Sequence, residues 1–178
     1  TVVDMGEDAV IIDAGLFLPA VVELQEKDNK NVNERLLRSV GAIPEDTILD
    51  KKDIRRKVRA ILVGHAHLDH VGALPHMAYR YNAEIVATPF TAEVLKTLVA
   101  DNPTGFKNPI KAIQPNSSYM IQGKSKQYQV DFINITHSTI QTSLIALHTP
   151  EGIVLYANDF KLDNSPIVGK KPNYEQIE

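Results

Sequence analysis

The sequence of 178 residues contains no cysteine and no tryptophan, and only 6% of its residues are aromatic. The absence of cysteine excludes disulfide bonds and any thiolate ligand to a metal ion. No apolar run is long enough to span a bilayer, and the first residues lack the pattern of a secretory signal peptide. We therefore expect a cytoplasmic protein without a membrane partner.

Hydrophobic residues make up 43% of the sequence and charged residues 23%, close to the averages of globular domains. A chain of this length corresponds to one domain and can bury a hydrophobic core. The net charge of −3 argues against a wholly basic nucleic-acid binder. One short stretch is basic, with Lys51, Lys52, Arg55, Arg56, Lys57 and Arg59. Because Asp50 and Asp53 lie within it and can pair locally, we favour a solvated helix over a site for RNA phosphates.

Residues 65–70 read His-Ala-His-Leu-Asp-His and follow the apolar, strand-like run 60–63. If the chain is still extended at the first two histidines, their spacing of two residues places both imidazoles on one face. The aspartate and the last histidine then lie near the start of a helical pattern and face back toward the strand. Imidazole and carboxylate groups suit zinc, and this arrangement fits two adjacent ions better than one.

Two later strand-like runs end in further candidate ligands, His137 after residues 133–136 and Asp159 after residues 156–158. Taken singly, each is equally compatible with an ordinary strand-end histidine or a turn aspartate. A single structural zinc is disfavoured because such sites are usually rich in cysteine. A pair of ions about 3.5–4 Å apart would hold a hydroxide between them, with Asp159 as the bridge. The predicted ligands are His65, His67 and His137 for one ion, and Asp69, His70 and Asp159 for the other.

This order of residues resembles the metallo-β-lactamase superfamily, whose motif H-x-H-x-D-H is followed by a later histidine and a later aspartate. The resemblance runs from about residue 2 to about residue 161. Asp13, in Val-Ile-Ile-Asp-Ala-Gly, resembles the family's early aspartate, which braces the metal loop from behind its ligands. Within the superfamily, His137-Ser138 and Asp159-Phe160-Lys161 are similar to the ribonuclease J branch of the beta-CASP nucleases. The long segment between Gly15 and Lys57 is similar to the archaeal type.

The chain departs from that branch at two places. Residues 139–143 read Thr-Ile-Gln-Thr-Ser where the branch often has Ile-Pro-Asp-Ser, and Asn158 stands where it usually has glycine. Neither change alters a predicted ligand.

The resemblance implies an α/β fold, the αββα sandwich, here incomplete. Residues 1–178 would be the N-terminal part of a metallo-β-lactamase domain that ends before a beta-CASP insertion and before a late histidine ligand. The resemblance further implies a ribonuclease with two zinc ions per full-length chain, or manganese in their place. It would hydrolyse RNA as a 5′-to-3′ exonuclease, with endonuclease activity as an additional option. Ser138 and Lys161 are the candidates for substrate contact, a homodimer could form through regions absent here, and the isolated chain should be weak or inactive.

Two other classes of function remain open. A small-molecule thioesterase or lactonase of the same superfamily would use the same metal ligands, and a non-catalytic RNA-binding half would not need them all. Asp159-Phe160-Lys161 favours the nuclease.

The remaining pattern alternates strands and helices around these motifs. His76 and His148 are expected to be structural, because one follows the motif within a helical pattern and the other lies within a strand. Thr88-Pro89 predicts a helix start, and Pro150-Glu151-Gly152 predicts a hairpin turn. Strands are predicted at 2–3, 9–12, 60–63, 83–87, 119–122, 128–135, 143–149 and 152–157; helices at 32–40, 71–81, 89–100 and from about 174; breaks at 102–105 and 114–116.

Overall fold

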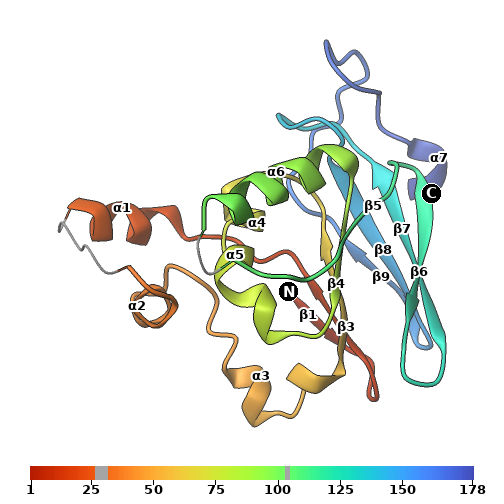
Figure 1. The fold of residues 1–178 in the computed structure, drawn as a ribbon. Coiled ribbons are helices and arrows are strands. Elements are labelled where there is room, and N and C mark those ends of the chain that lie inside the picture. The colour runs from red at the N-terminus through yellow and green to blue at the C-terminus, as the bar shows by residue number, and fades with distance from the viewer. Residues whose placement is uncertain (27–31, 103–104) are drawn as a thin grey trace.

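The computed structural model describes residues 1–26, 32–102 and 105–178. Within these residues the strands form two sheets that pack face to face, and helices cover the outer face of the first sheet (Figure 1). The second sheet has the short helix α7 at its outer side. The structure is therefore the expected mixed α/β sandwich, with a helical layer on one side and a single short helix on the other.

The first sheet contains β1 to β5 in chain order. β1 is antiparallel to β2, and the other neighbouring strands are parallel. The second sheet contains β6 to β9, each antiparallel to the next. The strands are β1 Val2–Asp4, β2 Ala9–Ile12, β3 Val58–Val63, β4 Glu84–Ala87, β5 Ile110–Ala112, β6 Ser117–Gln122, β7 Gln127–Asn134, β8 Ser143–Thr149 and β9 Gly152–Tyr156.

The helices fall between the strands of the first sheet, except for α7 near residue 178. None of those in the described ranges is long and apolar enough to cross a membrane. The helices are α1 Leu18–Glu26, α2 Glu34–Ser39, α3 Ile48–Lys51, α4 Leu68–Val71, α5 Leu74–Met77, α6 Pro89–Ala100 and α7 Tyr174–Ile177, with 3-10 turns η1 Arg55–Lys57 and η2 Ala78–Arg80.

The central strand β3 is buried on both faces, as its continuous apolar sequence predicts. Because side chains alternate along a strand, Ile61 and Val63 pack toward the helices, while Ala60 and Leu62 pack toward the second sheet. The second sheet contributes residues such as Phe132 to that inner layer. The core is therefore divided into two layers by the first sheet, and the ends of β3 are held rigidly in place.

Most predicted elements are confirmed, including α6, β8 and the hairpin turn before β9. The helix predicted at 32–40 is shorter, because the Asn33 side chain accepts a hydrogen bond from the backbone N–H of Leu36 and caps α2 at its start. The helical pattern predicted at 71–81 is confirmed only in part, since α4, α5 and the turn η2 stand in place of one continuous helix. The break predicted at 102–105 includes residues 103–104, which lie outside the described residues.

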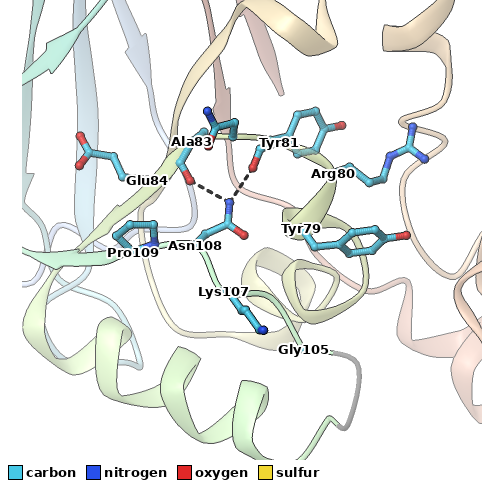
Figure 2. Close-up of a pocket in the computed structure, with 10 residues that line it drawn as sticks. Tyr79, Arg80, Tyr81, Ala83, Glu84, Gly105, Lys107, Asn108 and Pro109 are labelled. Atoms are coloured by element: carbon cyan, nitrogen blue, oxygen red, sulfur yellow. Dashed lines mark hydrogen bonds between the residues drawn. The ribbon is translucent and has the colours of Figure 1, made fainter.

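Helix α1 and strand β5 were not predicted. β5 lies at the edge of the first sheet, and the segment before it is fastened to the start of β4 by Asn108. The Asn108 amide donates to the carbonyl oxygens of Tyr81 and Ala83, at 2.8 Å each (Figure 2). A short strand held by such a distant contact leaves little local pattern in the sequence.

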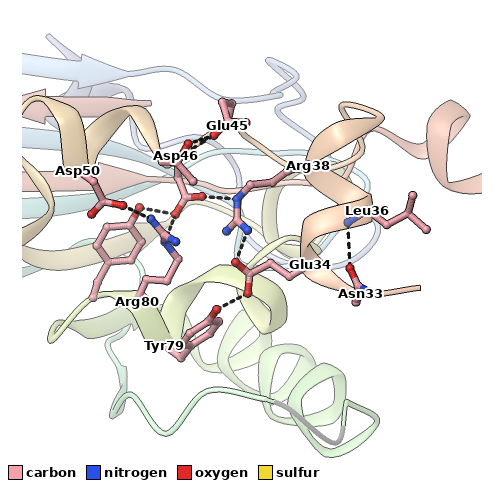
Figure 3. A network of polar contacts seen from close by, with 11 residues as sticks. Asn33, Glu34, Leu36, Arg38, Glu45, Asp46, Asp50, Tyr79 and Arg80 are labelled. Atoms are coloured by element: carbon pink, nitrogen blue, oxygen red, sulfur yellow. Dashed lines mark hydrogen bonds and ion pairs between the residues drawn. The ribbon is translucent and has the colours of Figure 1, made fainter. Parts of the chain in front are cut away.

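A network of buried charges attaches the region around α2 and α3 to η2 (Figure 3). Asp46 lies at its centre and is 5% exposed. Its carboxylate accepts from Arg38 Nε at 2.7 Å and from the Tyr81 hydroxyl at 2.7 Å, and it lies 2.9 Å from Arg80 Nε. Arg38 also pairs with Glu34, which accepts from Tyr79. This network holds the long connection between β2 and β3 against the rest of the helical layer.

Replacing the central carboxylate of this network should destabilise the fold. In Asp46→Asn, two largely buried guanidinium groups lose their shared counter-charge, so the free energy of unfolding should fall by about 3 kcal/mol or more. Urea denaturation measures this loss, and the exposed Asp53→Asn serves as the control. A change of less than about 1 kcal/mol in Asp46→Asn would show that the network is not needed for stability.

Candidate metal centre

The predicted ligands gather at one edge of the sandwich, where several strands end. His65 follows the carboxyl end of β3, and Asp13 follows that of the neighbouring parallel strand β2. His137 comes after β7, and Asp159 comes after β9. Loops at the carboxyl ends of parallel strands share one edge of a sheet, which explains why residues far apart in sequence meet here.

The motif at residues 65–70 has the expected local structure. His67 is extended, with φ −70° and ψ 147°, and directly precedes α4. Asp69 and His70 therefore lie in the first turn of that helix, as predicted. The turn brings His70 back against His65, with ring centroids 3.9 Å apart.

Three overlapping groups of described side chains have the spacing of metal ligands, one of them being Asp13 with His65 and His70; the other two contain the predicted ligands. One of these two contains His65, His67, His137 and Asp159, and the other contains Asp69, His70 and Asp159; within each, one ligand atom per residue lies within 4.8 Å of the others. His137 Nε2 is 3.1 Å from His67 Nδ1, close to the separation of about 3.3 Å expected for two nitrogens on one tetrahedral zinc ion. Asp159 belongs to both groups.

The Asp159 carboxylate lies between the two groups. Its Oδ2 is 3.8 Å from His70 Nε2 and 3.9 Å from His137 Nε2. Its side chain is 55% exposed, whereas that of His137 is only 13% exposed. The carboxylate is thus on the solvent side of the cluster, where a substrate would approach.

Asp13 braces the cluster from behind. Its backbone lies in the left-handed region with φ 53°. One carboxylate oxygen accepts from the backbone N–H of Gly64 at 2.9 Å, and the other lies 2.7 Å from His70 Nδ1. A proton on that Nδ1 leaves the lone pair of Nε2 facing Asp69 and Asp159, as a metal ligand requires.

Two glycines allow the loops of the site to approach closely. A Cβ atom on Gly15 would lie 1.6 Å from the carbonyl oxygen of Asp69, and one on Gly64 would lie 2.0 Å from Asn158 Nδ2. Ala14 and Leu16 donate backbone hydrogen bonds to the carbonyls of His70 and Leu68. The segment after β2 therefore runs directly along α4, and only glycine fits at this crossing.

The buried nitrogens of the cluster support a metal site. Nδ1 and Nε2 of His65 and Nδ1 of His137 are buried and, in the described part of the chain, have no hydrogen-bond partner. Buried polar atoms are rarely left unpaired, and a metal ion bound here would supply the missing partner for the lone pair of the neutral His65 ring. Burial, reinforced by the neighbouring His70 and His137, lowers the pKa of His65 to about 3. His65 is therefore neutral and able to coordinate a metal ion at neutral pH.

The other histidines are shifted in different directions. Burial lowers the pKa of His137, and the nearby His67 adds to this effect. Burial acts to lower the pKa of His70 as well, but the hydrogen bond to Asp13 and its negative charge raise it overall. The cluster thus combines nearly neutral imidazoles with one histidine polarised by a carboxylate.

The remaining predicted site residues lie at or away from this cluster. Ser138 Oγ is 3.2 Å from His67 Nε2, and Lys161 lines a cavity of about 290 Å³ together with His137 and Ser138. His76 lies 3.4 Å from Asn102, and neither His76 nor His148 belongs to any of the ligand groups found among the described residues.

His148 is instead paired with Asp131, whose carboxylate lies 2.7 Å from its Nε2. Both are on the second sheet, and this contact gives the histidine the structural partner expected of it.

The two departures from the nuclease pattern have structural roles that the sequence did not reveal. The Gln141 side chain accepts from the backbone N–H of Phe90 at 2.8 Å and caps α6, while Thr88 bonds to Thr91 instead. The backbone of Gln141 lies in the left-handed region, with φ 59°. Its hydrogen bond with Phe90 fixes the loop after His137 to α6 in the helical layer. In the sequence, the only sign of this capping role was a residue with a side-chain amide in a short polar loop.

Asn158 stands where the resembled nucleases usually have glycine. Its side chain fills the space above Gly64. It is 7% exposed and donates from Nδ2 to the carbonyl of Ser143 at 2.9 Å. This bond fixes the residue next to Asp159 against β8.

A comparison with family models identifies the class of protein. The model of the metallo-beta-lactamase superfamily matches residues 1–172. The chain belongs to the metallo-β-lactamase superfamily.

Similar solved structures support the fold. A protein of unknown function from Enterococcus faecalis matches with a TM-score of 0.64 and 19% identity, over 90% of this chain and 40% of that chain. A metallo-β-lactamase with a HARLDQ motif from Cronobacter sakazakii matches with a TM-score of 0.55 and 16% identity, over 94% of this chain and 55% of that one.

Among curated proteins, the chain is 37% identical to ribonuclease J of Methanocaldococcus jannaschii, over 99% of this chain and 39% of the relative. It is 34% identical to ribonuclease J of Pyrococcus abyssi, over 99% of this chain and 38% of the relative. The chain thus spans less than half the length of these two relatives.

The close crossing at Gly15 leads to a prediction. Gly15→Ala should displace α4 and destabilise the protein by more than about 2 kcal/mol, because the new Cβ overlaps backbone atoms. Gly41→Ala is the control: Gly41 has φ 72° and open space around it, so it should cost only about 1–2 kcal/mol of backbone strain. Chemical denaturation measures both losses, and an equal or smaller loss in Gly15→Ala would contradict the crossing.

Proposed function

We propose that this chain is the metal-binding part of a zinc-dependent ribonuclease that hydrolyses RNA phosphodiesters. The observation that supports it most is the sharing of Asp159 by two ligand groups that also contain all four predicted histidines. The ribonuclease J relatives supply the substrate class, since a metal cluster alone would equally suit a thioesterase or lactonase.

In this proposal His65, His67 and His137 hold one zinc ion, Asp69 and His70 hold the other, and Asp159 bridges them. When bound, the ions supply a hydroxide at neutral pH and stabilise the negative charge on phosphoryl oxygens. Manganese would serve the same ligands. The imidazole and carboxylate set, without cysteine, fits either ion.

The chain's own residues prepare the site for that chemistry. Asp13 fixes His70 by accepting a hydrogen bond from its Nδ1–H, so that Nε2 stays directed at Asp159. Ser138 and Lys161 line the cavity beside His137, where a hydroxyl donor and an ammonium group can bind the oxygens of a phosphodiester. The exposed Asp159 leaves the cluster open to an RNA strand.

We further propose that this activity belongs to a longer protein, because the archaeal relatives extend far beyond the matched region. The present chain would be the N-terminal part of its metallo-β-lactamase domain. A beta-CASP region would bind the RNA, and a late histidine would complete the second metal site. A 5′-to-3′ exonuclease, with endonuclease cleavage as a second activity, is the corresponding reaction, carried out in the cytoplasm.

Zinc binding by the full-length protein should depend on the histidine motif. His65→Ala/His67→Ala removes two ligands and should abolish binding of the first ion, whereas His148→Ala, on the second sheet, should retain both ions. The zinc content is measured by elemental analysis, with circular dichroism to check folding. His67→Ala, at a partly exposed position, provides a milder variant if the double variant does not fold. Wild-type zinc in a folded double variant would disprove the assignment.

The bridging role of Asp159 can be tested by activity. Asp159→Asn preserves size but removes the charge shared by the two groups, so RNA hydrolysis by the full-length protein should fall at least about a hundredfold. Asp101→Asn is the matched control, because it makes the same change at an exposed position that belongs to none of the ligand groups found among the described residues. Near-normal hydrolysis by a folded Asp159→Asn protein would exclude the bridge.

A further inference from the structure

Four arginines converge on a small cavity at the amino ends of β3 and β4. The metal centre lies at the opposite, carboxyl ends of these parallel strands. The cavity has a volume of about 190 Å³ and is lined by Arg55, Arg56, Val58, Arg59, Arg80 and Asn82. These residues lie just before or at the start of β3 and just before β4. The metal ligands follow the other end of β3, six residues or about 20 Å further along the strand.

Three of the guanidinium groups are fixed in place by carboxylates outside the cavity lining. Arg59 Nε contacts Asp8 at 2.5 Å, Arg55 Nε contacts Asp50 at 2.6 Å, and Arg80 contacts Asp46 and Asp50. Asp8 is itself fixed, because it is fully buried and accepts from the Lys124 N–H and the Tyr128 hydroxyl.

These ion pairs leave donors available for a ligand. Each guanidinium has five N–H donors, and Arg55 and Arg59 use only Nε in the contacts above. Arg56 is exposed and, among the described residues, has no carboxylate partner. No acidic residue lines the cavity. The cavity therefore presents unpaired terminal N–H groups on pre-positioned side chains.

A larger cavity of about 680 Å³ adjoins the first and shares Arg80 and Asn82 with it. Its lining includes Lys107 and Asn108, and also Tyr79 (Figure 2). The Asn108 amide is occupied by two backbone carbonyls, so the wall is held firmly. Together the cavities provide a place for one compact anion beside a space for a larger attached group.

We propose that this arginine cluster binds a phosphate group, carried either by a small phosphorylated molecule or by an RNA strand. Planar guanidinium groups recognise phosphate oxygens with paired hydrogen bonds, and an anion that bridges several arginines relieves their mutual repulsion. The carboxylates position the arginines without entering the cavity. The site is separate from the metal centre and does not depend on the function proposed for it.

The test measures phosphate affinity in the full-length, metal-loaded protein by calorimetry, with pyrophosphate, adenosine monophosphate and a short single-stranded RNA as probes. Arg56→Gln removes one unpaired guanidinium without breaking an ion pair. It should weaken binding of at least one probe about tenfold. Arg55→Gln should act in the same direction. The matched control is Arg35→Gln, at an exposed position of α2 that does not line the cavity.

The metal centre can also bind phosphate, but its contribution is common to all three variants and cancels in the comparison. An effect on pyrophosphate and the mononucleotide assigns the site to a small phosphorylated molecule, whereas an effect on the RNA alone assigns it to the nucleic-acid backbone. Equal affinities in Arg56→Gln, Arg55→Gln and Arg35→Gln for every probe would overturn the proposal. Zinc content should be unchanged in Arg56→Gln, because Arg56 belongs to none of the candidate ligand groups, so this result is independent of the metal assignment.

Discussion

The position of the whole histidine–aspartate cluster depends on the Asp13 carboxylate, which joins the ends of two neighbouring strands to α4. One oxygen accepts from Gly64 immediately before the histidine motif, and the other contacts His70 within it. The left-handed backbone at Asp13 directs the side chain into this gap. Because the carboxylate is nearly buried, both bonds form in a low-dielectric environment where charge-assisted hydrogen bonds are strong.

The cluster would be costly without a ligand. Several imidazoles are packed within a few ångströms of each other, and the nitrogens of the most deeply buried one have no protein partner in the described residues. Burial and mutual repulsion keep His65 neutral, so it cannot be satisfied by forming a buried ion pair. A bound cation would supply a partner for the lone pair of His65 and would offset the exposed carboxylates of Asp69 and Asp159.

The two ends of the parallel strands present opposite chemistry. At the carboxyl end, histidines and aspartates gather with the spacing of metal ligands. At the amino end, arginines gather around a cavity, and their carboxylate partners lie outside it. The rigid, doubly buried β3 holds the two sites a fixed distance apart.

The sequence by itself determined the metal motif, the strand that precedes it and the family, because the ligands at 65–70 are close in the chain and their spacing needs only a strand followed by a turn. It also located α6, since Pro89 and the apolar period are local signals. The sequence pattern could not determine the roles of Gln141 and Asn158, whose partners are 51 and 15 residues away. The basic stretch was interpreted as a solvated helix for the same reason: its charges acquire a shared cavity only when Arg80 and Asn82 are brought beside them by the pairing of β3 with β4. Contacts between distant residues are fixed by packing of the whole sheet, and local patterns do not specify them.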